Sequence, residues 1–182
     1  SITSAGVLTF SSAPDYEIKS SYSATVTATD GVNSATQLII VTVNNINDTN
    51  PVITSNNSFT ADENQTAIGM VTATDADSDD LTFTVSGNEL SITSAGVLTF
   101  VSAPDYETKT SYSATVTASD GTNSTTQNIT VSVNNVNDNS PSFTSNTTFT
   151  ADENQTAIGT VTATDADSDD LTFTVSGNEL SI

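Results

Sequence analysis

The stretch that decides the fold is SYSATVTAS at residues 111–119. Its apolar residues Tyr112, Ala114, Val116 and Ala118 alternate with Ser and Thr. Successive side chains of a strand point to opposite faces, so a period of two separates one buried face from one solvated face. That alternation is typical of antiparallel sheets. The stretch therefore predicts a half-buried β-strand.

The same alternation recurs along the chain between turn signals such as Ala95-Gly96 and Asp120-Gly121. No stretch has a convincing helical period. One unit of the chain contains seven expected strands, at 52–61, 66–74, 80–86, 89–93, 97–101, 110–119 and 126–134. Seven short strands in roughly 90 residues predict an all-β fold, a sandwich of two sheets.

The chain repeats itself with a period of 90 residues, as Pro14 matches Pro104. About four positions in five are identical, and every acidic position is kept. A unit of this length suits one small domain. Asn-rich, polar segments precede Pro51 and Pro141 and resemble linkers. We therefore expect the end of one unit, a complete unit and the front of another, at 1–50, 51–140 and 141–182.

The composition excludes several classes of function. The 182 residues carry 22 acids but only two bases, Lys19 and Lys109, for a net charge of −20. Nucleic acids and anionic membranes attract Lys and Arg, so neither is an expected partner. Without Cys or His, the usual zinc and copper ligands are missing, which leaves hard cations with oxygen ligands. Ser and Thr without an activating His argue against an enzyme, and no apolar run is long enough for membrane insertion.

Oxygen-bearing side chains recur at five points of each unit, always in a turn or at the end of an expected strand. In the complete unit these points are Asp62-Glu63-Asn64, Asp75-Ala76-Asp77, Asp105-Tyr106-Glu107, Asp120-Gly121 and Asn135-Val136-Asn137-Asp138. Calcium takes six to eight oxygens from carboxylates, amides and carbonyls. Loops that converge at one end of a sandwich can supply such a shell, so the pattern predicts Ca²⁺ as the bound ion.

In their order along the chain, these motifs resemble the calcium motifs of cadherin repeats: the Glu motif, the Asp-x-Asp motif, the Asp-Tyr-Glu motif, the later single Asp and the linker ending at Pro141. The resemblance covers the whole chain. It implies tandem seven-stranded Greek-key β-sandwiches (cadherin/immunoglobulin-like) of a large surface adhesin. The near-identity of the units, the two bases and the lack of Cys favour a bacterial-type adhesin. The chain departs from the family where Asn45 and Asn135 replace the first linker Asp and where Thr49 replaces a linker Asn. The loss of a carboxylate is expected to weaken the site, whereas Thr49 is expected to serve through its main-chain oxygen.

The resemblance also implies three calcium ions at each junction between units. The implied ligands of the first junction are Asp15, Glu17, Asn47, Asp48, Asp75, Asp77 and Asp120. Those of the second are Glu63, Asp105, Glu107, Asn137, Asp138, Asp165 and Asp167. Each junction lacks one motif within the 182 residues, so we expect incomplete binding by this piece alone.

Other acidic and aromatic residues near these motifs have simpler interpretations. Asp79-Asp80 and Asp169-Asp170 belong to no family motif and are expected to be solvated. An EF-hand is rejected because Asp80 stands where its loop needs Gly. Asp62 is equally compatible with a turn and with a ligand. Tyr16 and Tyr106 are expected to be packing residues.

We expect calcium to bridge carboxylates that otherwise repel, and so to stiffen the array. The predicted function is calcium-dependent adhesion or spacing, extracellular or at the cell surface, with further copies of the repeat in cis and homophilic or carbohydrate contacts in trans. One alternative is a self-polymerising filament subunit, completed by exchange of half-domains between molecules. Another is a carbohydrate-binding module.

Overall fold

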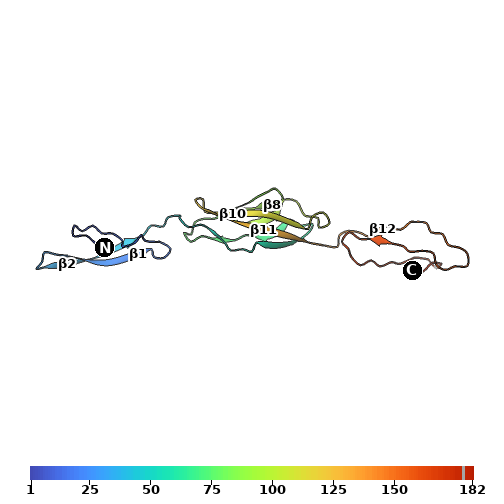
Figure 1. Cartoon of the computed structure of the whole chain (residues 1–182), viewed down its shortest axis with the longest axis horizontal. Coiled ribbons are helices and arrows are strands. Elements are labelled where there is room, and N and C mark those ends of the chain that lie inside the picture. Colours follow the sequence, from blue (N-terminus) through green and yellow to red (C-terminus); the bar gives the residue numbers. More distant parts are fainter. Residues whose placement is uncertain (178) are drawn as a thin grey trace.

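A computed structural model describes residues 1–177 and 179–182 as an elongated molecule of three bodies in a row, with the chain termini in the two outer bodies (Figure 1). Within these residues all regular structure is β-strand: β1 (Ser21–Thr29), β2 (Ser34–Thr42), β3 (Val52–Ile53), β4 (Ser58–Asp62), β5 (Ala67–Met70), β6 (Ala73–Thr74), β7 (Thr82–Val85), β8 (Leu90–Ile92), β9 (Val97–Phe100), β10 (Ser111–Ser119), β11 (Ser124–Asn134), β12 (Ser142–Phe143) and β13 (Ala163–Thr164). Among the described residues there is no helix long and apolar enough to cross a bilayer.

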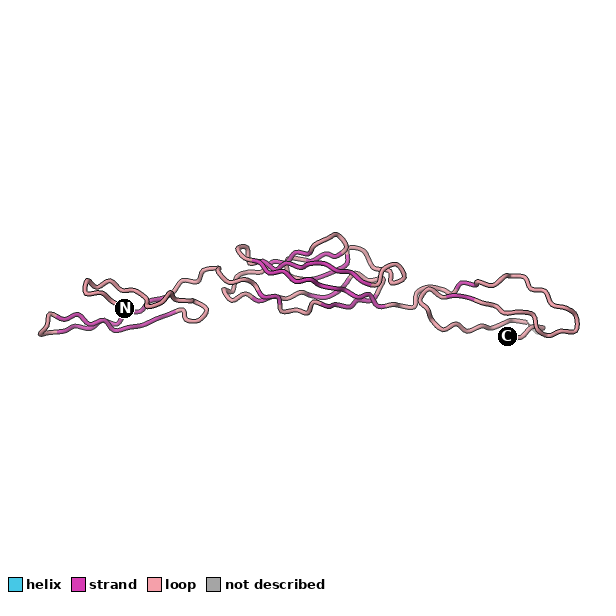
Figure 2. Tube along the Cα trace, in the orientation of Figure 1, coloured by secondary structure: helices cyan, strands magenta, loops and turns pink. Residues whose placement is uncertain are grey.

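Strands β3 to β11 form the middle body, where most of the regular structure lies (Figure 2). One sheet has the order β4-β11-β10-β7, a second has the order β5-β9-β8, and β3 pairs with β6. Strand β4 runs parallel to β11, and the other pairs are antiparallel. The chain passes between the two larger sheets after β4, after β5 by way of β6, after β7 and after β9. The result is a β-sandwich with Greek-key connections.

The alternation along β10 and β11 builds the core of this sandwich. Val116 and Ala118 of β10 and Ile129 and Val131 of β11 are at most 1% exposed. Leu98 reaches the same core from the facing sheet and is fully buried. The Ser and Thr residues between these positions point outward, as the period of two predicts.

Five of the seven expected strands lie within two residues of β7 to β11. The expectation of single strands at 52–61 and 66–74 is wrong, because each segment is broken into two strands, β3 and β4 in one case and β5 and β6 in the other. The two parts of each segment pair in different sheets. At the second break, Val71 donates its N–H to the carbonyl of Gly96 at 2.8 Å, between the two strands.

The outer bodies are open versions of the same structure. Residues 1–50 contain the hairpin β1–β2, and residues 141–182 contain the short pair β12–β13. Leu8 is 44% exposed although its counterpart Leu98 is fully buried, and Leu180 is 56% exposed against 4% for Leu90. The local sequences match, so the difference comes from the packing of the middle body, where both halves of a sandwich surround Leu98 and Leu90.

Candidate metal centres at the junctions between bodies

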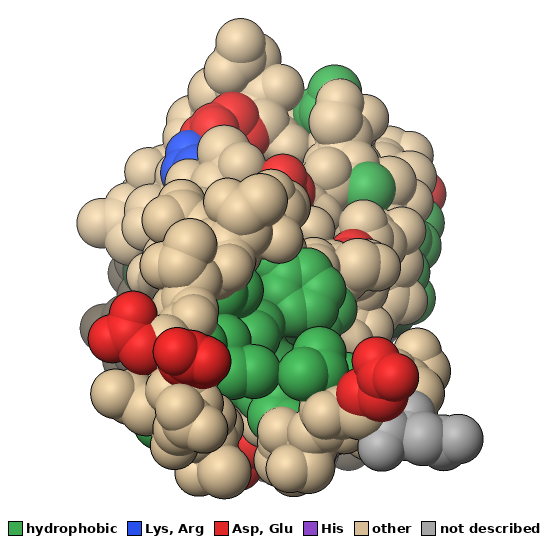
Figure 3. All heavy atoms as spheres, turned by 90° about the vertical axis from the view of Figure 1, so that its right-hand side faces the viewer, with side chains coloured by type: hydrophobic (Ala, Val, Ile, Leu, Met, Phe, Trp, Pro, Cys, Tyr) green, Lys and Arg blue, Asp and Glu red, His purple; other side chains and the backbone are tan. Residues whose placement is uncertain are grey.

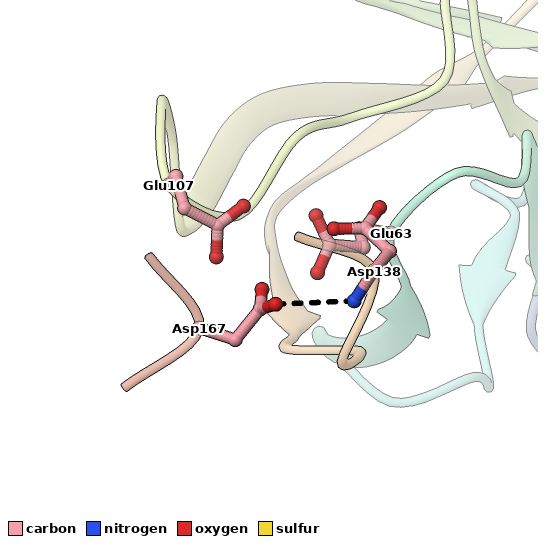
Figure 4. Close-up of side chains that lie close together, drawn as sticks. All are labelled: Glu63, Glu107, Asp138 and Asp167. Atoms are coloured by element: carbon pink, nitrogen blue, oxygen red, sulfur yellow. Dashed lines mark hydrogen bonds between the residues drawn. The ribbon is translucent and has the colours of Figure 1, made fainter. Parts of the chain in front are cut away.

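Carboxylates from two bodies meet at the second junction, around the linker at 134–141. Glu63, Glu107, Asp138 and Asp167 each offer one oxygen, and these four atoms lie within 4.8 Å of one another (Figure 4). Glu63 directly follows β4, and Glu107 lies in the loop before β10. Asp138 belongs to the linker, and Asp167 follows β13 in the next body. The fold therefore gathers four acids that are widely separated in sequence.

Glu63 connects the elements around this cluster. It is only 4% exposed. Its Oε2 accepts the N–H of Tyr106 at 2.8 Å, and its Oε1 accepts the N–H of Val136 at 2.8 Å. One carboxylate therefore holds both the loop before β10 and the linker against the end of β4.

Asp167 connects the linker to the next body. Its Oδ2 accepts the backbone N–H of Asp138 at 3.1 Å and that of Asn139 at 2.8 Å. The side-chain amide of Asn135 donates to the backbone oxygen of Asp167 at 2.8 Å. The side chain of an Asp at position 135 would have no N–H to donate in this contact. The departure from the family motif thus adds a hydrogen bond across the junction while it removes a charge.

A cavity of about 180 Å³ opens at this cluster, lined by Glu63, Asn64, Asp105, Glu107, Asp138, Asn139 and Ala166. Desolvation raises the pKa of Glu107, and the carboxylates of Glu63 and Asp167 raise it further, although a backbone hydrogen bond opposes the shift. The raised pKa means that negative charge is disfavoured here without a cation. Hard oxygen donors around a small cavity are the ligand set that calcium prefers.

The first junction, around the linker at 44–51, repeats this arrangement. Oxygens of Glu17, Asp48 and Asp77 lie within 4.8 Å of one another. The Oδ2 atom of Asp77 accepts the N–H of Thr49 at 2.8 Å and that of Asp48 at 3.1 Å, and Asn45 donates to the Asp77 backbone oxygen at 2.7 Å. The N–H of Thr49 is the main reason that the pKa of Asp77 is lowered.

Three carboxylate oxygens at the first junction are buried without a hydrogen-bond partner among the described residues: Asp75 Oδ2, Asp77 Oδ1 and Asp120 Oδ2. A buried, unpaired carboxylate oxygen is costly, and native structures normally satisfy such atoms. Cations bound at this junction would supply partners for such oxygens. The donor set therefore fits calcium at this junction also.

Sequence reasoning did not place Asp79 or Asp169 among the candidate ligands. Both are exposed, as expected, yet an oxygen of Asp79 lies within 4.8 Å of oxygens of Asp75 and Asp77, and Asp169 is placed in the same way beside Asp165 and Asp167. The spacing of two residues between successive acids was the available signal. Desolvation raises the pKa of Asp79, with further contributions from Asp75 and Asp77.

The remaining expected ligands do not all lie in the acidic clusters. Asn47 accepts a hydrogen bond from Asn123 at 2.8 Å, a residue that the motifs did not identify. Asp15 accepts the N–H of Ile18 at 3.0 Å, and Asp105 accepts that of Thr108 at 3.0 Å. Within the described residues, Asp15 and Asp105 stand outside the acidic clusters, although Asp105 lines the cavity.

The second junction carries a further amide contact that sequence reasoning also missed. The side-chain amide of Asn139 donates to Asp138 at 2.7 Å and to Asp167 at 3.1 Å. The side-chain hydroxyl of Thr49, its counterpart at the first junction, makes only a long contact to Asp48, at 3.4 Å. Asn137 lies in the same linker. As expected, Tyr106 packs against the core.

Comparisons with known proteins place this geometry in context. The family model described as a bacterial Ig domain matches residues 47–133. The mouse cadherin EGF LAG seven-pass G-type receptor 2 is 32% identical over 143 residues, which cover 71% of this chain and 5% of the receptor. Mouse protocadherin Fat 4 is 35% identical over 130 residues, which cover 64% of this chain and 3% of that protein. The chain therefore spans a small part of the length of these relatives.

Similarity extends to solved structures. The structure described as a protocadherin gammaB7 EC3-6 cis-dimer superposes with a TM-score of 0.71 and 25% identity, and covers 85% of this chain and 44% of that one. The matched proteins are adhesion-type extracellular domains rather than enzymes. The expectations of a β-sandwich and of a protein without enzymatic function are confirmed.

Proposed function

Because the chain belongs to the cadherin-like repeats, we propose that calcium ions at its two junctions hold successive β-sandwiches in line. The rod so formed is an extracellular spacer or adhesive element of a larger surface protein, with further repeats in cis. Cadherin repeats generally bind calcium, and the relatives are extracellular cadherin domains. We propose unit boundaries at Pro51 and Pro141, where each linker ends.

One observation supports this proposal above all others. Glu63 and Glu107 belong to the middle body, Asp138 to the linker and Asp167 to the next body, and their oxygens converge within 4.8 Å. Without a counter-ion, these like charges repel across the joint. An ion with a flexible oxygen shell can bridge all four acids and fix the angle between the bodies.

The expected affinity follows from the class of site. Calcium sites of extracellular modules have dissociation constants of about 10⁻⁴–10⁻³ M. At a calcium concentration ten times the dissociation constant, one site adds about 1.4 kcal/mol to the stability of the bound form. The buried core stabilises the sandwich without the ion. Its effect is on the orientation of one body relative to the next.

Distances between spin labels test the proposed rod. The chain has no cysteine, so Thr130→Cys and Thr147→Cys place one label on each side of the second junction, both at exposed positions. We expect a broad distribution of distances in EDTA and a narrow one in calcium. The labelled chain is diluted with unlabelled chain, so that only distances within one molecule contribute.

Two matched variants complete this experiment. Asp167→Asn removes a carboxylate from the cluster and is expected to shift the narrowing to higher calcium concentration. Asp170→Asn removes an equal charge nearby, outside the clusters described for this part of the chain, and is expected to leave the calcium dependence unchanged. Equal distributions in EDTA and in saturating calcium would refute the rod mechanism.

A further inference from the structure

The two linkers carry different side chains two residues before the proline, Thr49 in the first and Asn139 in the second. The backbone at this position makes the same contact at both junctions. The N–H of Thr49 donates to Oδ2 of Asp77 at 2.8 Å, and the N–H of Asn139 donates to Oδ2 of Asp167 at 2.8 Å. A difference between the contacts of the two side chains therefore comes from the residue type and not from a different path of the linker.

The side-chain amide of Asn139 lies among three carboxylates of the second junction. It donates to Oδ1 of Asp138 at 2.7 Å and to Oδ1 of Asp167 at 3.1 Å. A longer contact, of 3.4 Å, reaches Oε2 of Glu107. These carboxylates converge from the loop before β10, the linker and the next body (Figure 4). An amide group has two N–H donors, so one neutral side chain joins both bodies and the linker.

The hydroxyl of Thr49 does not take this place at the first junction. It makes a long contact to Oδ1 of Asp48, at 3.4 Å. Oδ1 of Asp77 is buried without a hydrogen-bond partner in the described part of the chain, whereas the equivalent Oδ1 of Asp167 accepts the amide of Asn139. Threonine has a shorter side chain and one donor in place of two. The residue two before the proline therefore decides whether this carboxylate oxygen has a partner inside the protein.

The lysines do not neutralise these acids. Acidic side chains prevail among the charged groups on the face seen along the molecule from its C-terminal body (Figure 3). Lys109 pairs with Glu89, and Lys19 lies over the ring of Tyr22, 4.5 Å from its centroid. Within residues 1–177 and 179–182, neither ammonium group forms an ion pair with an acid of the junctions. Amide N–H groups are therefore the donors that these carboxylates have when no ion is bound.

We propose that the side chain of Asn139 is a placeholder, which occupies the carboxylates of the second junction without calcium and leaves them when calcium binds. This inference rests on the proposed function, since the ion is to take the same oxygens. The partial positive charge of an amide offsets the repulsion between Asp138 and Asp167 less than an ion does. The placeholder therefore closes only part of the molecules in EDTA. Thr49 supplies no equivalent group at the first junction.

Competition with the placeholder gives the effect on calcium affinity a definite sign. The apparent dissociation constant equals the intrinsic one divided by the fraction of junctions whose carboxylates the amide leaves free. If the amide occupies half of the junctions in EDTA, its removal should halve the calcium concentration needed for half-closure. A residue that only supports the calcium-bound form would act in the opposite direction, because its removal would raise that concentration.

Reciprocal variants test the placeholder, because the repeat itself supplies both side chains. Asn139→Thr is measured with the label pair chosen above for the second junction. Thr49→Asn is measured with Ile40→Cys and Asn57→Cys, which are exposed residues at the equivalent positions around the first junction. In EDTA, Asn139→Thr should lower the ratio of closed to open molecules by at least about tenfold, the equivalent of one hydrogen bond to a charged group.

The reciprocal change should have the reciprocal effect. Thr49→Asn should raise the ratio of closed to open molecules at the first junction in EDTA, and should raise the calcium concentration for half-closure there by about twofold. At the second junction, Asn139→Thr should lower that concentration by about twofold. Both variants should reach the same narrow distance distribution as the unmodified chain in saturating calcium.

Control measurements separate the placeholder from other effects. Asn88→Thr makes the same substitution at an exposed residue of the middle body and should leave both distributions unchanged. The thermal unfolding of the middle body, followed by circular dichroism, should be the same in all variants. Equal distributions for Asn139→Thr and the unmodified chain in EDTA would overturn the placeholder. A higher calcium requirement in Asn139→Thr would overturn its displacement by the ion.

The measurements in EDTA separate this proposal from the proposed function, because they involve no calcium. Distributions that calcium leaves unchanged would refute the rod and, with it, the displacement of the amide. A difference between Asn139→Thr and the unmodified chain in EDTA would still support the contact that closes the joint. Conversely, a junction that calcium narrows equally in all variants, with no difference between them in EDTA, would support the rod and overturn the placeholder.

Discussion

Replacement of Glu63 with alanine should loosen the second junction even in the absence of calcium. The carboxylate is 4% exposed and accepts two backbone N–H groups, from Tyr106 and Val136, each at 2.8 Å. Alanine leaves both donors without this partner. Hydrogen bonds to charged groups contribute about 1.5–3 kcal/mol each, so the loss of two is about 3–6 kcal/mol. For a domain of this size, each kcal/mol lowers the unfolding temperature by about 4–8 °C.

The repeat supplies a matched control at Glu153. This residue has the same sequence neighbours as Glu63, yet it is exposed in the open C-terminal body. Glu153→Ala should therefore change the stability of the middle body by no more than about 0.5 kcal/mol. Glu63→Gln keeps one acceptor oxygen and should lose roughly half as much as the alanine variant.

The assay is thermal unfolding in EDTA at low protein concentration, followed by far-ultraviolet circular dichroism. Calorimetric titration then measures the calcium affinity of each variant, which Glu63→Ala should lower at least about tenfold, or 1.4 kcal/mol. If Glu63→Ala and Glu153→Ala unfold at the same temperature in EDTA, the structural role assigned to this carboxylate is wrong.

Of three further predictions, the first two compare equivalent residues of two repeats. Leu98→Ala, at a fully buried site, should cost about 3–5 kcal/mol in urea denaturation, whereas Leu8→Ala, 44% exposed, should leave the middle body unchanged; equal losses would contradict the assigned core. Gly96→Ala should destabilise strongly, since a Cβ there would meet the Val71 backbone oxygen at 2.2 Å. Gly6→Ala has no neighbour within 4 Å but a φ of 81°, so it should cost only the backbone strain of about 1–2 kcal/mol; equal changes in unfolding temperature would contradict the clash at Gly96. Because the pKa of Glu107 is raised from 4.5, chiefly by desolvation, its charge destabilises the metal-free fold at neutral pH, and this penalty fades as the pH falls through the raised value. Glu107→Gln should hence be more stable than the unmodified chain in EDTA at pH 7, with the gap in urea midpoint closing toward pH 4.5; a constant gap would contradict the assignment.

The fold could be anticipated where burial follows a local pattern. The alternation along 111–119 predicts β10, and its inward residues Val116 and Ala118 are fully buried. The same reasoning located β7, β8, β9 and β11. It failed at 52–61 and 66–74, because a break in a strand depends on which sheet each part joins. That choice is made by distant partners, such as Gly96 for the N–H of Val71.

The motifs predicted the four acids that meet at the second junction, but they did not predict every acid that lies beside the junctions. The five acidic motifs and the linkers pointed to the junctions, where the carboxylates of Glu63, Glu107, Asp138 and Asp167 meet. Asp79 was left out, and its position accompanies a turn at Ser78, whose φ of 66° lies in the left-handed region. No residue type reliably predicts that backbone conformation. The amides that bind the linker to the next body depend equally on tertiary geometry.

The amino-acid sequence by itself determined the alternating strands such as β10 and β11, the spacing of the acids and the order of the repeats, because these follow from residue type and position along the chain. It did not determine which copy of a repeated residue is buried. Leu8 and Leu98 have the same neighbours in sequence, but only Leu98 lies beneath the opposite half of a sandwich. Burial and the convergence of acids are properties of what packs against a segment. They were therefore decided by the tertiary structure alone.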